Sequence, residues 1–538
     1  MEAAQPDRPT QQPTAGKRRR GGRSARQSLR AAPLAEDTRP VRPGMESQRY
    51  QALTEAEQAR VHAAVLDVLE NIGLADAIPS CIEAVEAMGG FMNDKGRLCF
   101  PAALVEDAIA NANRDVVLYG QKSEHDVEPR GKRVYFGTAG AAVHIVDPVT
   151  GEYRDSTLRD LYDIARLVDT LDHVHFFQRP VVARDMESGR LLDLNTTYAG
   201  VSGTTKHLGT SFVSPESVDE SLAMLHMIAG GEARWRARPF VSQSNCFVVP
   251  PLKFAQDACR CLEAAVAGGM PVLLLSAGQA GATGPAALAG TLVQAMAEVL
   301  AGLVYVNALK PKAAAMIGPW PFVSDLRTGA MSGGSGEQAL LMSACGTMGR
   351  FYDLPTGVAS AMTDSKVPDA QAGAEKGYNH ALIGNSGANL IYESAGMHGS
   401  LLGFCLESLV IDNDVIGAVQ RTIRGIEIDE RTLAREVIRE VCEEGPGHYL
   451  GHGQTLRRME TDYVYPEVGN RLSPQEWAAS GSPNVLDTAL VKTRERLQTH
   501  FPGHISGDMD ARIRADFDIR LPREAMAPDQ NIQGGTET

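Results

Sequence analysis

Residues 354–376 hold the densest group of side chains in this sequence that could do chemistry. An apolar segment, 356–361, leads into a polar loop with Asp364 and Lys366, and a segment with helical character follows and carries Glu375. In folds built from repeated strand–helix units, active-site residues lie in the loops that follow the strands. The stretch therefore suits a binding or catalytic loop.

The same stretch also fits an ordinary connection between a strand and a helix. Asp369 follows Pro368, which places it near the start of a helix, and Gln371 and Lys376 would lie within that helix beside Glu375. Both interpretations stay open on these residues alone. The rest of the chain must decide between them.

Polar or aromatic residues follow most of the other apolar segments. If those segments are parallel strands, the residues meet at one end of the sheet. They are Thr210, Ser211, Gln243, Ser244, Asn245, Gln279, Trp320, Tyr392, Glu393, Asp412, Asn413 and Asp414. The glycine clusters 278–284 and 333–336 have neither Walker nor dinucleotide spacing, so we interpret them as helix caps rather than phosphate cradles.

The usual signatures of covalent or metal-dependent hydrolysis are missing. The sequence has no G-x-S-x-G and no H-E-x-x-H, and His144, His207, His380 and His398 are too far apart to form an H-x-x-x-H site. Carboxylates and aromatic rings remain. They suit a cationic methylated nitrogen, because a quaternary ammonium donates no hydrogen bonds and is held by cation–π and coulombic attraction. Composition alone does not decide this.

The elements that would position these residues alternate regularly. Apolar runs of about four to ten residues are separated by helical patterns, which predicts parallel strands with helical crossovers. Eight such runs favour a closed barrel: 174–182, 208–213, 240–249, 271–276, 313–317, 356–361, 389–393 and 409–412. Helices are expected between them at 215–228, 252–267, 285–309, 335–349, 370–383 and 396–407, whereas 183–207 shows no clear helix.

We therefore predict an α/β protein with a TIM (β/α)8 barrel and helical additions at both ends. The predicted divisions are a disordered basic tail over 1–45, a helical entry domain with a β hairpin over 46–172, the barrel over 173–425, a C-terminal helical extension over 426–525 and a disordered tail over 526–538. The entry domain begins with a capping box at Thr54 and Glu57, and a turn is expected at 147–151.

Charge and composition exclude several classes of protein. The formal net charge is −14, and because residues 1–42 carry ten basic against four acidic residues, the remainder carries −20. An acidic body argues against nucleic acid as a partner. The longest apolar segment, 286–309, is interrupted by polar residues and predicts a buried helix rather than a membrane span. The eight cysteines form no C-x-x-C, which fits a reducing cytoplasm.

With these residues in view, the chain resembles the trimethylamine methyltransferase (MttB-type) family. The matching segments are 136–140, 284–293, 363–376 and 409–414, and the resemblance spans roughly residues 50–520. The segment 363–376 is long enough to be specific. The resemblance implies a TIM barrel that moves a methyl group from a methylated amine to the Co(I) of a corrinoid on a separate small protein, with no metal bound by this chain itself.

The resemblance also bears on the substrate. Trimethylamine members have pyrrolysine near the start of the segment that resembles 363–366, and the nearest position here is Met362. This departure points to members without pyrrolysine, which include glycine betaine methyltransferases and enzymes for related betaines. Alternatives are another betaine such as carnitine or proline betaine, trimethylamine itself, or a sensor that binds a methylated amine without turnover. We also expect a homo-oligomer.

The roles that the resemblance suggests are as follows. Met362, Asp364, Lys366 and Glu375 are the expected catalytic residues, in the loop that faces the methyl donor. Substrate binding would use the aromatic faces of Phe136, Trp320 and Tyr392, a carboxylate of Glu393 or Glu375 against the cation, Gln371 in the same motif, and Gln279, His398 or Lys366 against a substrate carboxylate. Core packing is the alternative for each aromatic residue.

Overall fold

The computed structural model describes residues 39–528, which divide into two compact units. The larger unit comprises Val41–Ile428 and the described residues from Val464 onward, and the smaller contains Asp429–Tyr463. Most of the predicted basic tail, residues 1–38, lies outside the described residues, as does 529–538. Val41 and Met45 of the predicted tail are buried in the larger unit.

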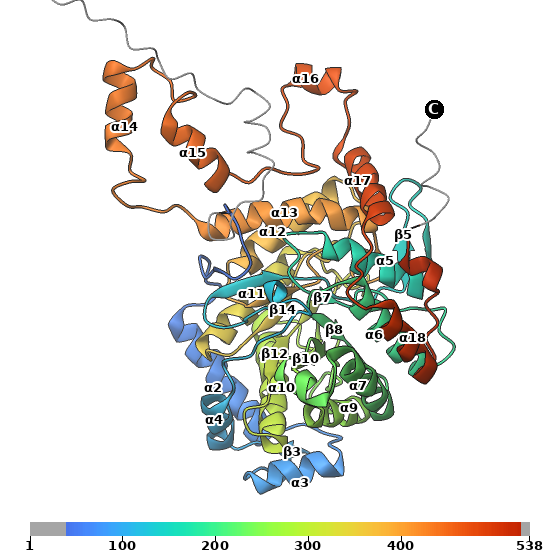
Figure 1. Ribbon diagram of the computed structural model, residues 1–538. Helices are drawn as coiled ribbons and strands as arrows, with labels where there is room; N and C mark the ends of the chain where they lie inside the picture. The colour runs from blue at the N-terminus through green and yellow to red at the C-terminus, as the bar shows by residue number, and fades with distance from the viewer. Residues whose placement is uncertain (1–38, 529–538) are drawn as a thin grey trace, which may run out of the picture. The chain divides into compact units, whose positions relative to one another are not determined.

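In residues 39–528, eight strands of the larger unit pair in parallel within two sheets. Figure 1 shows several of them at its centre with helices around them. The strands are β4 (Arg133–Phe136), β7 (Phe177–Gln178), β8 (Leu208–Thr210), β9 (Val241–Gln243), β10 (Val272–Ser276), β12 (Ala315–Pro319), β14 (Gly357–Ala359) and β15 (Leu390–Tyr392). One sheet has the order β12-β10-β9-β8-β7, and the other has the order β4-β15-β14 with the short antiparallel β1 (Met45–Glu46) beside β4. Single parallel bridges join Gly137 to Phe176 and Ile317 to Thr356, between the two sheets.

Seven of the eight strands expected from the apolar runs are confirmed, and the eighth was wrong. Residues 409–412 lie inside helix α13 (Leu406–Arg424). The segment 396–407, expected as a helix, holds strands β16 (Met397–His398) and β17 (Gly403–Phe404), which pair antiparallel. A run of four apolar residues is compatible with a buried helix as well as with a buried strand, which explains the error. The eighth parallel strand is β4, from the segment 46–172.

The two faces of these strands have different neighbours. Successive side chains of a strand point to opposite faces. Phe136 faces the helices, since its ring lies 5.8 Å from that of His380 and a Cβ on Gly384 would touch it. Tyr392 faces the other way, since its ring lies against Gly357 and Phe176. The strands therefore bury an aromatic cluster on the face turned away from the helices.

The helices between the strands are α6 (Gly189–Gly203), α7 (Pro215–Ala229), α8 (Glu232–Ala237), α9 (Gln256–Ala267), α10 (Leu288–Leu309), α11 (Gly336–Phe351) and α12 (Ala370–Gly384). Helix α6 was not expected. Its interior residues Asn195, Thr196 and Thr197 are buried, so no apolar stripe marks it, and its start shows only in the cap that Ser188 provides to Leu191.

Helix α10 is the one helix among the described residues that is long and apolar enough to cross a membrane. Most of its surface is buried inside the larger unit, where it packs against β10, β12 and α2 (Glu55–Asn71). This confirms the predicted buried helix.

The N-terminal part of the larger unit is helical, as expected. It contains α2, α3 (Pro79–Ala87), α4 (Ala102–Asn111) and α5 (Leu158–Asp169), and the short pairs β2 (Phe91–Met92) with β3 (Leu98–Cys99) and β5 (His144–Val146) with β6 (Tyr153–Asp155). The capping box of Thr54 and Glu57 is present. The turn at 147–151 is confirmed, because the Gly151 amide donates to the Asp147 carbonyl at 2.9 Å.

The C-terminal helices α17 (Val485–Thr499) and α18 (Gly507–Asp516) belong to the larger unit, where α17 packs against α13 and α5, and α18 against α7. The guanidinium of Arg166 in α5 donates to the carbonyls of Leu497 and His500, and the His500 ring bonds to Asp169 at 2.8 Å. Helix α16 (Pro474–Ala479) precedes them. The smaller unit contains α14 (Arg435–Arg439), a π-helical turn (Glu440–Glu444) and α15 (Gly453–Thr461).

Candidate functional site

Three aromatic rings from different parts of the parallel strands pack together. The Tyr392 ring, at the end of β15, lies 4.9 Å from that of Phe176 and 5.2 Å from that of Trp320, which follows β12. The indole N–H of Trp320 donates to the Gly357 carbonyl at 3.0 Å, which fixes the ring. All three side chains are buried. The three rings therefore form a rigid aromatic cluster, packed at interplanar angles of 67° and 48°.

Glu393, the residue after Tyr392, brings a carboxylate to the same end of the strands. Its backbone is left-handed, with φ at 57°, and its side chain is only 1% exposed. The Oε2 atom has no hydrogen-bond partner among the described residues. Burial raises the pKa of this carboxyl to about 8, since the charged form loses its water. An unpaired carboxylate in this position is suited to a cationic ligand, because a buried charge requires a partner.

A polar pair joins the ends of β7 and β9, on either side of β8. Gln178, at the end of β7, donates from Nε2 to the Ser244 hydroxyl, which in turn donates to the Thr210 carbonyl at 3.2 Å. The amide atoms of Gln243 are buried and have no partner in the described part of the chain. The sequence analysis missed Gln178. Its only signal was a polar residue within the run 174–182, which also contains His175 and Arg179.

The loop after β14 is tied to two other loops by Asp364. Its carboxylate accepts hydrogen bonds from the Ser332 hydroxyl at 2.6 Å, the Ser400 hydroxyl at 2.7 Å and the Gly334 amide at 3.3 Å. These partners come from the chain before α11 and from the turn between β16 and β17. Asp364 therefore holds three loops together.

Glu375, in helix α12, accepts hydrogen bonds from the same loop. Its Oε2 accepts from the Thr363 hydroxyl at 2.5 Å and from the Asp364 amide at 2.8 Å, and its Oε1 accepts from the Gln371 side chain at 2.8 Å. Both of its oxygens have partners within the protein, in contrast to Glu393. As expected, Asp369 stands at the helix start and caps it, since its Oδ1 accepts from the Ala372 amide.

Two expected catalytic residues of this loop lie at opposite extremes of exposure. Met362 has no exposed surface, and the backbone of Gly333 lies directly over it, since a Cβ on that glycine would come within 2.7 Å of the Met362 carbonyl. Lys366 is exposed, and its ammonium group donates to the Asp364 carbonyl at 2.6 Å.

The remaining predicted site residues are spread more widely. Phe136 is buried against helix α12, away from Tyr392. Gln279 lies in the short strand β11 (Gln279–Ala280), which pairs with β13 (Phe322–Val323). His398 is buried and bonds through Nε2 to the Ser408 hydroxyl at 2.7 Å, and burial lowers the pKa of its imidazole. The structure therefore brings together Trp320 and Tyr392, with Glu393 next in the chain after Tyr392, and it places Phe136, Gln279 and His398 elsewhere.

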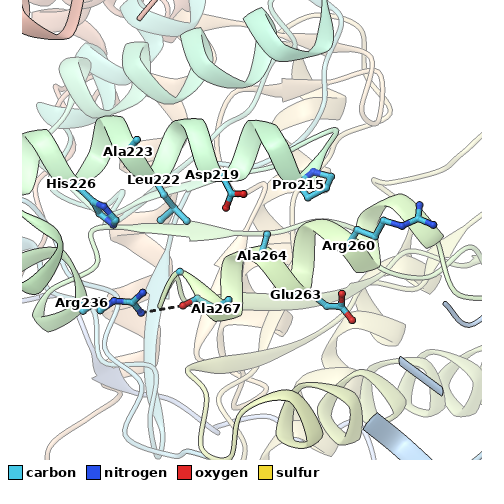
Figure 2. A pocket seen from close by; sticks show the side chains of 11 residues that line it. Pro215, Asp219, Leu222, Ala223, His226, Arg236, Arg260, Glu263, Ala264 and Ala267 are labelled. Atoms are coloured by element: carbon cyan, nitrogen blue, oxygen red, sulfur yellow. Dashed lines mark hydrogen bonds between the residues drawn. The ribbon is translucent and has the colours of Figure 1, made fainter. Parts of the chain in front are cut away.

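A surface groove of about 780 Å³ lies between helices α7 and α9 (Figure 2). Its two arginines already have partners, since Arg236 pairs with Glu232 and donates to the Ala267 carbonyl, and Arg260 pairs with Asp257. In residues 39–528, no group of three or more His, Cys, Asp or Glu side chains is placed to hold a metal ion. The unpaired carboxylate of Glu393 therefore makes the strand ends the stronger candidate site.

Comparisons with known proteins identify the family of this chain. It is 33% identical over 472 residues to trimethylamine methyltransferase MttB2 of Methanosarcina mazei, an alignment that covers 86% of this chain and 94% of that protein. It is 30% identical over 469 residues to trimethylamine methyltransferase MttB of Desulfitobacterium hafniense, with 86% and 92% covered. It is 27% identical over 470 residues to the glycine betaine methyltransferase of that species, with 87% and 96% covered.

Among solved structures, a dihydropteroate synthase of Xanthomonas albilineans aligns over 57% of this chain and 98% of its own, at 14% identity and a TM-score of 0.34, which is too low to bear on the fold. The family model for trimethylamine methyltransferase (MTTB) matches residues 19–525. This chain belongs to the trimethylamine methyltransferase family.

Proposed function

We propose that this protein transfers a methyl group from a quaternary ammonium compound, with glycine betaine as the first candidate, to the cobalt of a corrinoid carried by a separate protein. The observation that supports this most is the buried Glu393 carboxyl, which follows Tyr392 in the chain and whose Oε2 has no partner in the described residues. A cation held there would have a charge partner. The glycine betaine methyltransferase at 27% identity supports the choice of betaine.

The reaction requires little from the protein beyond positioning the substrate. When a nucleophile attacks one methyl carbon of a quaternary ammonium, the C–N bond breaks and its electron pair stays on nitrogen, so the amine leaves neutral without needing a proton. General acid catalysis is therefore unnecessary, and orientation and exclusion of water are the protein's contribution. The corrinoid would act as the second substrate, the methyl acceptor, and the strand ends would face it.

We further propose that the parallel strands close into one barrel. The bridges from Gly137 to Phe176 and from Ile317 to Thr356 support this, since they lie at the two places where the sheets end. In a barrel order, β4 would take the place that the sequence analysis gave to 409–412. Active sites of such barrels lie at the carboxyl ends of the strands, where Glu393 lies.

Glu393 fits the proposed substrate better than Glu375 does. Glu375 has both oxygens engaged within the loop, whereas Glu393 has an oxygen without a partner in the described residues. Binding a cation would stabilise the ionised form of Glu393 and return the pKa of its carboxyl toward an ordinary value. Turnover of another betaine remains the alternative, with the same cation site and a different substituent on nitrogen.

The test is an anaerobic assay with purified protein and a reduced corrinoid, on its partner protein and free. Glycine betaine, carnitine, proline betaine and trimethylamine are supplied in turn, with the visible spectrum and the demethylated amine as readouts. We expect glycine betaine to give dimethylglycine and a methylated corrinoid. Turnover of trimethylamine alone would contradict the proposal. Tight binding of a betaine with no methyl transfer to either corrinoid form would favour a sensor.

A further inference from the structure

A cavity of about 530 Å³ lies in the larger unit, between the hairpin of β5 and β6, the start of α13 and helix α17. Cavities of this size hold small molecules in many proteins. None of the candidate site residues described above lines it. The cavity is therefore separate from the proposed substrate site.

Negative charge exceeds positive charge in the walls of this cavity. Two basic residues line it, and one of them, Arg154, is already engaged, because its guanidinium donates to the two oxygens of Asp160 at 2.6 and 2.8 Å. Asp160 is not part of the lining. The other basic residue, Arg494, is thus left against three acidic residues. They are Asp147, Glu152 and Glu407. This balance suits a cationic ligand better than an anionic one.

Two of the acidic residues in the lining influence each other. Burial raises the pKa of the Glu407 carboxyl, and the charge of Asp147 adds to this effect. The carboxylate of Asp147 accepts hydrogen bonds from the amides of Thr150 and Val149, which lower the pKa of that carboxyl and keep it ionised. A cation in the cavity would offset the repulsion and favour the ionised form of Glu407.

A buried hydroxyl in the wall formed by α17 also lacks a partner. Thr493 lines the cavity and is 3% exposed, and its Oγ1 atom makes no hydrogen bond with the described residues. An unsatisfied buried hydroxyl costs free energy, which a ligand with a hydrogen-bonding group would recover. Independently of the charges, Thr493 therefore indicates a polar group of a ligand at this wall.

The lining also distinguishes between kinds of cation. Among the described residues, none that lines the cavity is aromatic, whereas sites for quaternary ammonium groups rely on aromatic faces. Carboxylates and hydroxyls instead accept hydrogen bonds from N–H groups. Much of the remaining wall is aliphatic and would pack against an alkyl chain. These aliphatic residues include Val149, Leu406, Leu490 and Leu497.

We infer that this cavity binds a small aliphatic primary amine in its protonated form. The carboxylates of Glu407 and Asp147 are its charge partners, and the Thr493 hydroxyl is a hydrogen-bond acceptor for its N–H groups. Its alkyl chain packs against the leucines of α13 and α17. The inference is independent of the proposed function, because no residue of the substrate site takes part.

The first experiment measures the binding of pentylamine to the full-length protein by calorimetry. Pentyltrimethylammonium and 1-pentanol, which have the same alkyl chain, are then tested for displacement of the bound amine. We expect each to need at least about a tenfold higher concentration than pentylamine, because only the primary amine has both a charge and N–H donors. The absence of saturable pentylamine binding, or equally effective displacement by either competitor, would overturn the inference.

The second experiment uses variants of the lining. Glu407→Gln should weaken pentylamine binding at least about tenfold. Thr493→Val should weaken it about threefold to tenfold without lowering the melting temperature, because it removes an unsatisfied hydroxyl and keeps the shape of the side chain. Glu86→Gln, at an exposed position of α3, is the matched control and should bind normally. If Glu407→Gln does not fold, Thr493→Val decides, and normal pentylamine binding by that variant overturns the inference.

Hydrogen exchange followed by mass spectrometry locates the bound amine. We expect pentylamine to slow amide exchange in residues 145–154 and 490–498. Slower exchange in residues 389–393 instead would place the amine at the strand ends and overturn the inference. The two proposals can fail separately, since a protein that turns over no quaternary amine would refute the proposed function and leave this site unaffected.

Discussion

Lys376 and Asp412 form a buried ion pair that holds the loop after β15. The Lys376 ammonium lies 2.6 Å from Asp412 Oδ2, and both side chains are 3% exposed. The same Asp412 oxygen accepts from the Gly396 amide at 2.7 Å. Because Gly396 ends the short loop that begins with Glu393, the pair fixes that loop between helices α12 and α13. The position of Glu393 thus depends on a charge pair outside the proposed substrate site.

Replacing Lys376 with methionine should destabilise the protein, because it leaves the Asp412 charge buried without a partner. A loss of about 3–5 kcal/mol in unfolding free energy is expected. The double variant Lys376→Met/Asp412→Asn removes the charge and keeps an acceptor for the Gly396 amide, so it should recover a substantial part of that loss. Urea unfolding followed by circular dichroism measures both. Equal stability of the single and double variants would contradict this account.

Betaine affinity should rise with pH until the Glu393 carboxyl is ionised. The carboxyl must lose its proton to pair with a cation, and its pKa is raised to about 8 by burial. Below that pH, each unit of acidification should therefore weaken binding by up to about tenfold. Glu393→Gln should bind weakly with no such slope. Calorimetry in buffers of different ionisation enthalpy would show proton release on binding to wild type alone, and its absence in wild type would argue against Glu393 as the cation's partner.

The same carboxyl should make the ligand-free protein less stable at higher pH. Its pKa is higher in the folded state than the ordinary 4.5, so between that pH and about 8 the folded state binds more protons than the unfolded state. Unfolding free energy should then fall as pH rises through this window. Glu393→Gln should have a flatter profile, with the difference growing toward pH 8. Thermal unfolding at pH 5 to 8.5 measures it, and parallel profiles for the two proteins would refute it.

Replacing Trp320 with alanine should weaken cation binding. The substitution removes an aromatic face beside Tyr392 and the hydrogen bond to the Gly357 carbonyl. A cation–π contribution of about 1–2 kcal/mol corresponds to roughly a 5- to 30-fold rise in Kd. Phe136→Leu is the control, because that ring packs against α12 and should affect stability without changing Kd. Equal effects of the two substitutions on Kd would argue against an aromatic contribution from Trp320.

Local patterns predicted much of this fold. Seven parallel strands follow from apolar runs, and the capping box of Thr54 and Glu57 marks α2, because these features depend on neighbours in sequence. The eighth strand could not be predicted this way. Residues 133–136 precede a hairpin and a helix, and only pairing with β15, over 250 residues later, makes them part of the parallel sheet.

The candidate site was predicted only in part, because local patterns identify residues at strand ends but not their partners in space. Glu393 ends the apolar run 389–393 and Trp320 follows the run 313–317 by three residues, so the rule that loops after strands carry function identified them. Whether a carboxylate is free to bind a ligand depends on its partners in space, however. The side chains that engage Asp364 come from Ser332 and Ser400, more than thirty residues away in either direction, and no local pattern indicates them.

Glu375→Ala distinguishes the two carboxylates that the sequence left as candidates for the cation's partner. Glu375 holds Thr363 and the Asp364 amide, so its loss should loosen the loop after β14 and lower stability by about 1–3 kcal/mol. We expect kcat to fall more than substrate Kd rises, because the cation itself is assigned to Glu393. Gln371→Ala is the matched control, since it removes one exposed hydrogen bond to the same carboxylate and should change stability by less than about 0.5 kcal/mol. A large loss of betaine affinity in Glu375→Ala, with Glu393→Gln binding normally, would reverse the assignment and make the loop of Asp364 the substrate site.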